Sequence, residues 1–237
     1  EILFRTKLSE NLFRGLSPWM QKLPGGLIHV NVVGCALFAA ISGSSAATVA
    51  TVGKMSIPEL RKRKYPEKIL LGSLAGSGTL GLLIPPSIIL IIYGVAVQES
   101  IAKLFIAGII PGIMIALIFM SYVIIWSLLN KKKMPKIIEE YTFLEKVKKS
   151  KQLLPVIILI LGVIGSIYTG IATATEAASL GVVGALLLSY FQKSLNIETF
   201  KSSLLGATKT SCMIAFILAG ATFLSLALGF TRLPRNL

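Results

Sequence analysis

Long apolar runs separated by short polar segments dominate the hydrophobic pattern of this 237-residue sequence. A transmembrane helix needs about 20 predominantly apolar residues, and runs of this kind are typical of membrane spans. The composition agrees, because 54% of the residues are hydrophobic and 14% are charged, against about 25% charged in soluble domains. We therefore expect an all-α integral membrane protein. Uncharged runs cover Ile69–Gln98, Leu104–Asn130, Leu153–Thr175 and Ala177–Phe191.

Two of the apolar stretches are interrupted by residues that disfavour a helix. Ser42–Ser45 (Ser-Gly-Ser-Ser) lies in a stretch with no charged residue from His29 to Gly53. Gly76–Ser87 holds three glycines and the pair Pro85-Pro86, and proline disrupts the hydrogen bonds of the preceding helical turn. Unpaired polar groups are costly in hydrocarbon. The two breaks therefore indicate backbone carbonyls and hydroxyls that gather around an ion or a solute. The alternative for the serines is close helix packing through small residues.

The first break predicts a re-entrant hairpin rather than a crossing. Leu27–Ile41 has only 15 residues, which is short for a span, and basic sequence lies on both sides of the stretch. A segment that leaves on the side it entered would place its tip, Ser42–Ser45, in the middle of the membrane. The second stretch is long enough to cross and predicts a broken helix.

These patterns predict five regions in chain order. We expect an amphipathic interfacial arm helix at 1–24 and one half of a transport domain at 25–100, with the hairpin at 25–53 and the broken helix at 66–98. A transmembrane helix at 101–129, a cytoplasmic basic loop at 130–152 and scaffold helices at 153–237 follow, the last of them expected over Leu204–Phe230 after a polar connector. Glu176 is expected at a helix start, where a carboxylate suits the helix dipole. Because residue 1 is Glu and no signal peptide is visible, we expect the chain to begin inside a larger polypeptide.

The formal charge is +14, and its placement sets the expected topology. Glu59–Lys68 carries five basic residues and Asn130–Gln152 carries eight. By the positive-inside rule both loops are expected on the cytoplasmic side. Nucleic-acid binding is not expected, because the basic residues flank membrane spans and no aromatic stacking pattern accompanies them.

The polar chemistry of the breaks favours ion binding over catalysis. His29 is the single histidine, so no Cys/His metal cluster is expected, and because it lies at the start of an apolar segment we expect an interfacial or packing residue and not a member of a Ser-His-Asp triad. Gly76–Gly81 fits the dinucleotide pattern G-x-G-x-x-G, but a preceding strand is not expected. Hydroxyls and free carbonyls without carboxylates suit a hard monovalent cation such as Na⁺. We therefore expect a transporter and not an enzyme, with an ion channel or a non-transporting membrane scaffold protein as alternatives.

The sequence resembles the large membrane subunit of the tripartite ATP-independent periplasmic (TRAP) transporters over essentially its whole length. The sequence around Ser42–Gly53 is most similar to that of the sialic acid members. At one position the chain departs from the family pattern, because Ala174 replaces a proline. The motifs that carry the resemblance are Pro24-Gly25-Gly26-Leu27, His29-Val30-Asn31-Val32, Ala39-Ala40-Ile41-Ser42-Gly43-Ser44-Ser45-Ala46-Ala47, Gly81-Leu82-Leu83-Ile84-Pro85-Pro86-Ser87, Tyr93-Gly94, Ala107-Gly108-Ile109-Ile110-Pro111-Gly112 and Thr173-Ala174-Thr175-Glu176-Ala177-Ala178.

The resemblance implies an elevator-type secondary transporter of the bacterial inner membrane, with inverted repeats of which the second is incomplete here. It implies Na⁺ coupling, uptake of a small organic anion (sialic acid first, a C4-dicarboxylate next) and delivery by a periplasmic solute-binding protein. It also implies a small membrane (Q) subunit, separate or fused. Together with the two breaks it predicts a sodium site at Ser42, Ser45, Gly81, Ile84 and Pro86. Substrate contacts are predicted at Ser44, Ser45 and Ser87.

Overall fold

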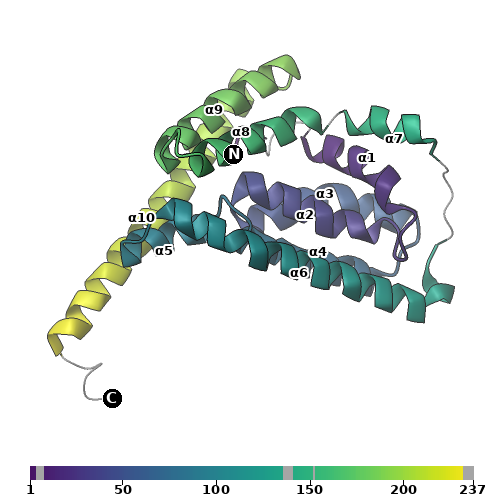
Figure 1. Cartoon of the computed structure of the whole chain (residues 1–237), viewed down its shortest axis with the longest axis horizontal. Coiled ribbons are helices and arrows are strands. Elements are labelled where there is room, and N and C mark those ends of the chain that lie inside the picture. The colour runs from purple at the N-terminus through teal and green to yellow at the C-terminus, as the bar shows by residue number, and fades with distance from the viewer. Residues whose placement is uncertain (4–7, 136–140, 152, 232–237) are drawn as a thin grey trace.

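The computed structural model describes residues 1–3, 8–135, 141–151 and 153–231, and within them all regular secondary structure is helical (Figure 1). The first half contains α1 (Leu8–Met20), α2 (Ile28–Ser42), α3 (Ser45–Lys62), α4 (Glu67–Gly78), the 3₁₀ helix η2 (Thr79–Leu82) and α5 (Ile88–Val97). The second half contains α6 (Ile101–Leu129), η3 (Lys131–Lys133), α7 (Phe143–Ser150), α8 (Leu154–Tyr168), α9 (Ala174–Phe191) and α10 (Ile197–Thr231). The predicted all-helical class is confirmed.

The core lies where α2 packs against α3 and α4, with α1 on one side and α6 along another (Figure 1). Phe38, Leu60 and Leu70 are fully buried there. This body holds both predicted breaks, one between α2 and α3 and one between η2 and α5. Its packing therefore fixes where the breaks lie relative to each other.

Helices α8 and α9 pack against each other, Val156 and Ala185 of this pair join the hydrophobic core of the body, and α10 extends away from it (Figure 1). Thr173 caps the start of α9, because its hydroxyl oxygen accepts from the Glu176 N–H at 3.3 Å, while Glu176 Oε2 accepts from the Thr173 N–H at 2.8 Å. The expected place of Glu176 at a helix start is thus confirmed. A reciprocal cap of this kind satisfies amide groups that the first helical turn leaves unpaired.

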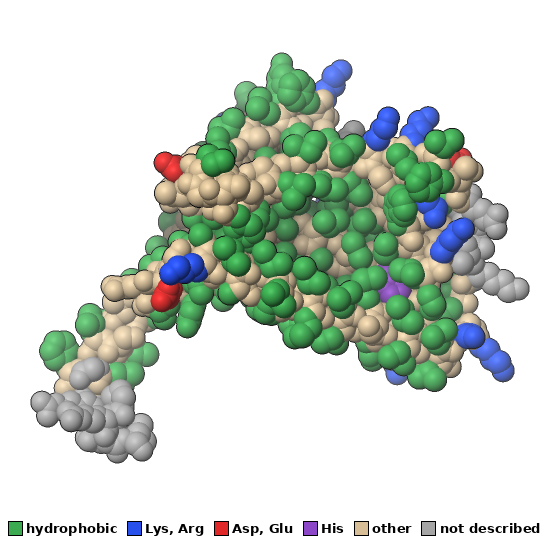
Figure 2. Space-filling model, viewed as in Figure 1, with side chains coloured by type: hydrophobic (Ala, Val, Ile, Leu, Met, Phe, Trp, Pro, Cys, Tyr) green, Lys and Arg blue, Asp and Glu red, His purple; other side chains and the backbone are tan. Residues whose placement is uncertain are grey.

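Three described helices are long and apolar enough to cross a membrane, namely Ile101–Leu129, Ala174–Phe191 and Ile197–Leu228. Their side chains are mostly not buried within the chain, as expected for surfaces that face lipid or neighbouring helices. Figure 2 shows hydrophobic side chains over most of the viewed face, while Lys and Arg gather near α7 and the C-terminal end of α6. This distribution is that of an integral membrane protein.

Helix bounds differ from the expected ones where charge was used to place them. α3 continues past Gly53 to Lys62, and α10 begins at Ile197 rather than near Leu204. Charged side chains mark the membrane boundary without breaking a helix, since Lys, Arg and Glu are good helix formers. The expected basic loop at 130–152 also contains α7, whose start carries a Thr142–Glu145 capping box. Residues 136–140 and 152 of that loop, 4–7 of the expected arm and 232–237 of the expected scaffold lie outside the described residues.

Candidate functional site

The tip between α2 and α3 is a tight turn built from glycine and serine. Gly43 adopts a left-handed conformation (φ 58°) and its N–H donates to the Ala39 carbonyl at 2.9 Å, which ends α2. Glycine takes this conformation without the steric cost that a Cβ would bring. Ser44 then caps α3, with its hydroxyl accepting from the Ala47 N–H at 3.5 Å.

Ser42 is the centre of a small hydroxyl network at this tip. Its Oγ lies 2.8 Å from Thr48 Oγ1 and also accepts from the Ser44 N–H at 3.2 Å. Thr48 is fully buried. Thr48 is not among the predicted site residues. Its position one turn into the helix after the Ser-Gly-Ser-Ser tip is the signal that could have identified it.

The second break lies between Leu82 and Ile88. The Ser87 side chain is fully buried, and its hydroxyl donates to the Leu82 carbonyl at 2.7 Å. Ser87 also stands at the N-cap of α5, and the Ile91 N–H donates to its carbonyl at 3.1 Å. Ile84 places its side chain in an apolar cluster with Val32, Ala39 and Leu80.

The two breaks lie directly against each other. The Ile88 N–H donates to the Gly43 carbonyl at 3.2 Å. A Cβ added at Gly43 would stand 2.6 Å from the Pro86 carbonyl oxygen, and one added at Gly81 would stand 2.8 Å from the Ser45 nitrogen. Residues separated by about 40 positions in the sequence therefore share one site.

One buried polar atom at this site has no partner among the described residues. The hydroxyl oxygen of Ser45 is fully buried and forms no hydrogen bond there. A buried, unsatisfied hydroxyl costs free energy that an ion or a polar ligand can offset. Hydroxyl and carbonyl oxygens are the ligands that a hard cation takes in transporters, and the two breaks that meet here contain both.

Helix α6 supports the second break through two glycines. A Cβ at Gly108 would meet the Leu83 carbonyl oxygen at 2.7 Å, and one at Gly112 would meet Ile84 Cγ1 at 3.0 Å. Small residues four apart let membrane helices approach closely. Both glycines belong to the family motif Ala107–Gly112, which by itself predicts no contact with the second break. Their Gly-x-x-x-Gly spacing is the signal that predicts the contact.

A cavity of about 620 Å³ opens beside the hairpin tip. It is lined by Ser42 and Ser44 of the tip, by apolar side chains of α5 and by Thr210 and Ser211 of α10, among others. Its size is within the range of small-molecule sites. Of the predicted substrate residues Ser44 lines this cavity, whereas Ser45 and Ser87 do not. Ser42, predicted as a sodium residue, also reaches it.

Comparison with known proteins identifies relatives over most of the chain. The sequence model described as "Tripartite ATP-independent periplasmic transporter, DctM component" matches residues 1–237. The C4-dicarboxylate TRAP transporter large permease protein DctM of Pseudomonas aeruginosa is 36% identical over 90% of this chain and 49% of its own length. The sialic acid TRAP transporter large permease protein SiaM of Vibrio cholerae is 32% identical over 97% of this chain and 53% of its own length. The chain thus spans about half the length of these relatives.

Proposed function

Because the chain belongs to the DctM family of TRAP transporters, we propose that it carries a small organic anion across the bacterial inner membrane by Na⁺-coupled uptake. The chain is a transporter permease component of the inner membrane and not an enzyme. The observation that carries the proposal is the contact between the two breaks. This contact brings the hydroxyls of the hairpin tip next to the unwound backbone of the second break. The long membrane-spanning helices of the protein are otherwise apolar.

The proposed sodium site uses oxygen atoms from both breaks. Ser42 and Ser45 supply hydroxyl or carbonyl oxygens from the hairpin tip, and Gly81, Ile84 and Pro86 supply carbonyls from the unwound segment. The unpaired Ser45 hydroxyl and the contact of Gly81 with the Ser44–Ser45 backbone support this assignment. Transporters commonly hold Na⁺ between discontinuous helices in this manner.

The proposed substrate lies in the cavity beside the tip, against Ser44, with Ser45 and Ser87 nearby. We propose sialic acid as the first candidate, because the sequence around Ser42–Gly53 resembles the sialic acid members most. A C4-dicarboxylate is the second candidate. Overall identity is slightly higher to the C4-dicarboxylate relative (36%) than to the sialic acid relative (32%), so the two substrates must be compared directly.

The proposed mechanism is an elevator movement of the two breaks as one body. Separating them would break the Ile88–Gly43 hydrogen bond and expose polar backbone to hydrocarbon, which costs several kcal/mol for each unsatisfied group. α8 and α9 serve as scaffold. A crosslink between hairpin and broken helix should therefore leave transport intact, and a crosslink from the hairpin to α9 should abolish it. The reverse pattern would rule out this division.

The proposal also includes two protein partners. A periplasmic solute-binding protein delivers the anion, and a small (Q) membrane subunit, separate or fused, joins the large subunit. An isethionate TRAP transporter permease protein of Oleidesulfovibrio alaskensis, 33% identical over 97% of this chain, is named DctMQ.

Uptake into proteoliposomes tests the function. The full-length protein, with its small subunit and binding protein, is supplied with labelled sialic acid or succinate under an inward Na⁺ gradient or a K⁺ gradient. We expect saturable uptake of one of the two solutes, and we expect this uptake to require both Na⁺ and the binding protein. Equal uptake under both gradients would contradict Na⁺ coupling, and flux that rises linearly with solute would favour a channel.

A further inference from the structure

A second polar cavity lies between α1, the C-terminal half of α3, the end of α7 and Tyr141, which precedes α7, and it shares no lining residue with the cavity beside the hairpin tip. Its volume is about 510 Å³. Three cationic side chains and one carboxylate line it, giving the lining a net charge of +2 (three positive, one negative). The lining residues are Phe13, Arg14, Ser17, Met55, Glu59, Arg63, Tyr141 and Lys149.

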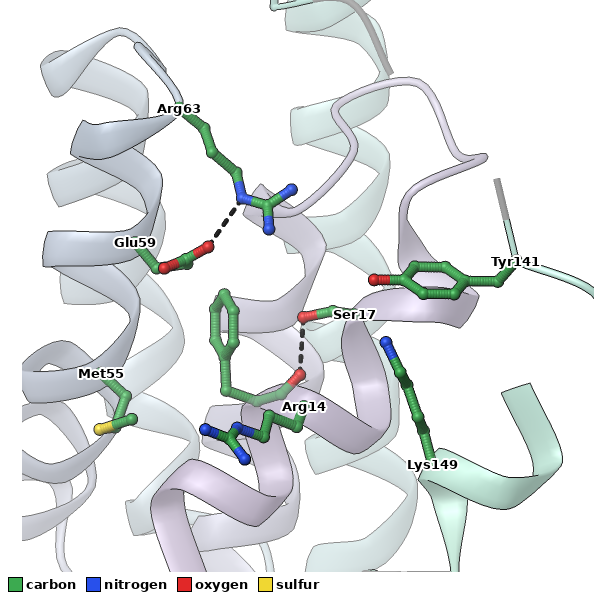
Figure 3. A pocket seen from close by; sticks show the side chains of 8 residues that line it. Arg14, Ser17, Met55, Glu59, Arg63, Tyr141 and Lys149 are labelled. Carbon is green, nitrogen blue, oxygen red and sulfur yellow. Dashed lines mark hydrogen bonds and ion pairs between the residues drawn. The ribbon is translucent and has the colours of Figure 1, made fainter. Parts of the chain in front are cut away.

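Two contacts hold polar groups of this cavity in place. Arg63 Nε donates to Glu59 Oε1 at 2.8 Å, one turn apart on α3. The Lys149 amine lies 3.8 Å from the centre of the Tyr141 ring. Figure 3 shows Tyr141 and the Lys149 amine on the α7 side of α1, near Ser17, and Glu59, Arg63 and Met55 on its α3 side, toward which the Arg14 guanidinium is directed. The cavity thus combines cationic groups with an apolar wall.

Helix α7 links this cavity to a membrane surface. Trp19 of α1 donates through Nε1 to Ser150 Oγ at 2.7 Å. The centres of the Trp19 and Phe143 rings lie 6.2 Å apart in a T-shaped arrangement. The Lys146 amine lies 5.5 Å from the centre of the same Trp19 ring. Phe143 and Leu144 are 67% and 76% exposed. A short helix with exposed apolar side chains at one end and lysines along it is typical of elements that lie in the headgroup region.

We propose that this cavity binds the phosphate of an anionic phospholipid headgroup at the membrane surface where the basic loops lie. Arg14, Arg63 and Lys149 supply the positive charge for the phosphate. Phe13 and Met55 face the glycerol and the first methylenes, and Phe143 and Leu144 insert beside the acyl chains. A soluble phosphate would use the same cations but would gain nothing from these apolar surfaces, so the two ligands can be separated by experiment.

The test measures binding of phosphatidylglycerol that carries a fluorescent acyl chain to the full-length protein in neutral detergent micelles, by fluorescence anisotropy. Arg14→Gln with Lys149→Gln removes two cavity cations. Lys132→Gln with Lys133→Gln removes two exposed cations of η3, outside the cavity, and is the matched control. Because a cation that directly contacts the phosphate contributes at least about a fivefold change in affinity, whereas an exposed cation without such a contact contributes little, the cavity pair should weaken binding roughly 25-fold or more. The control pair should change it less than about threefold.

Competition and a conservative variant complete the design. Unlabelled phosphatidylglycerol should displace the probe, whereas phosphatidylcholine and millimolar inorganic phosphate should not. Lys149→Arg keeps the charge and should keep the affinity. Equal losses in both double variants, displacement by inorganic phosphate alone, or a Lys149→Arg loss as large as that of Lys149→Gln would each overturn the proposal.

Discussion

Replacement of Gly81 by alanine should disturb the proposed sodium site without removing any of its oxygen atoms. The added Cβ would stand 2.8 Å from the Ser45 nitrogen and 2.9 Å from the Ser44 carbonyl carbon, while ordinary contacts begin at 3.4 Å. One break must therefore move by about 0.6 Å (3.4 − 2.8) relative to the other. Both obstacles are backbone atoms, so no side-chain rotation can relieve the clash.

The structural cost of this overpacking is about 1–3 kcal/mol. A displacement of this size at a site that needs precise geometry can reduce function by one or two orders of magnitude. We expect the Na⁺ concentration for half-maximal uptake to rise roughly tenfold in Gly81→Ala, measured in proteoliposomes of the full-length protein.

Gly72→Ala provides the matched control for this experiment. Gly72 lies on α4, and a Cβ there would meet no atom within 4 Å. Alanine in a helix interior is favoured over glycine by roughly 0.5–1 kcal/mol, so this variant should be slightly more stable and keep its Na⁺ dependence. If Gly81→Ala retains the wild-type Na⁺ dependence and thermal stability, the close contact between the two breaks is refuted.

Three further predictions address the tip, the α9 cap and the topology. Ser42→Ala removes the 2.8 Å contact with Thr48 and should weaken Na⁺ activation more than the affinity for the delivered anion; unchanged Na⁺ activation in uptake assays would count strongly against the site. Thr173→Ala removes the cap of α9 and should lower the free energy of unfolding by about 1 kcal/mol, seen as a lower thermal midpoint, whereas an unchanged midpoint would mean that the cap contributes little. In a background without Cys35 and Cys212, Glu99→Cys should react with an impermeant thiol reagent from the periplasm and Lys132→Cys should not; periplasmic labelling at position 132 would reverse the topology.

The parts of the fold that the sequence predicts best are those governed by strong local rules. The presence of α6 and its end at Leu129 follow from the uncharged run Leu104–Asn130, which is long enough to span a membrane. Both breaks follow from glycine and proline, which limit the backbone whatever surrounds them. Helix ends among charged residues were placed less well, as α3 and α10 show, because charge marks a change of solvent and not a change of backbone conformation. The Thr142–Glu145 capping box would have predicted the start of α7.

The candidate site was predictable as a set of residues but not as a geometry. Two polar breaks in apolar sequence indicate that Ser42–Ser45 and Gly81–Ser87 share a partner. Which atoms meet depends on packing between distant segments. The support of the second break by Gly108 and Gly112 and the burial of Thr48 under Ser42 arise only when α2, α3 and α6 are assembled.

Direct Na⁺ binding by the full-length protein tests the central claim of a cation site between the two breaks. A ligand that binds the folded state raises the thermal midpoint in a concentration-dependent manner. We predict that Na⁺ raises this midpoint while K⁺ at equal ionic strength does not, and that Ser45→Ala shifts the response to roughly tenfold higher Na⁺ concentration. Equal responses to Na⁺ and K⁺, or a Ser45→Ala response that matches the wild type, would contradict the site.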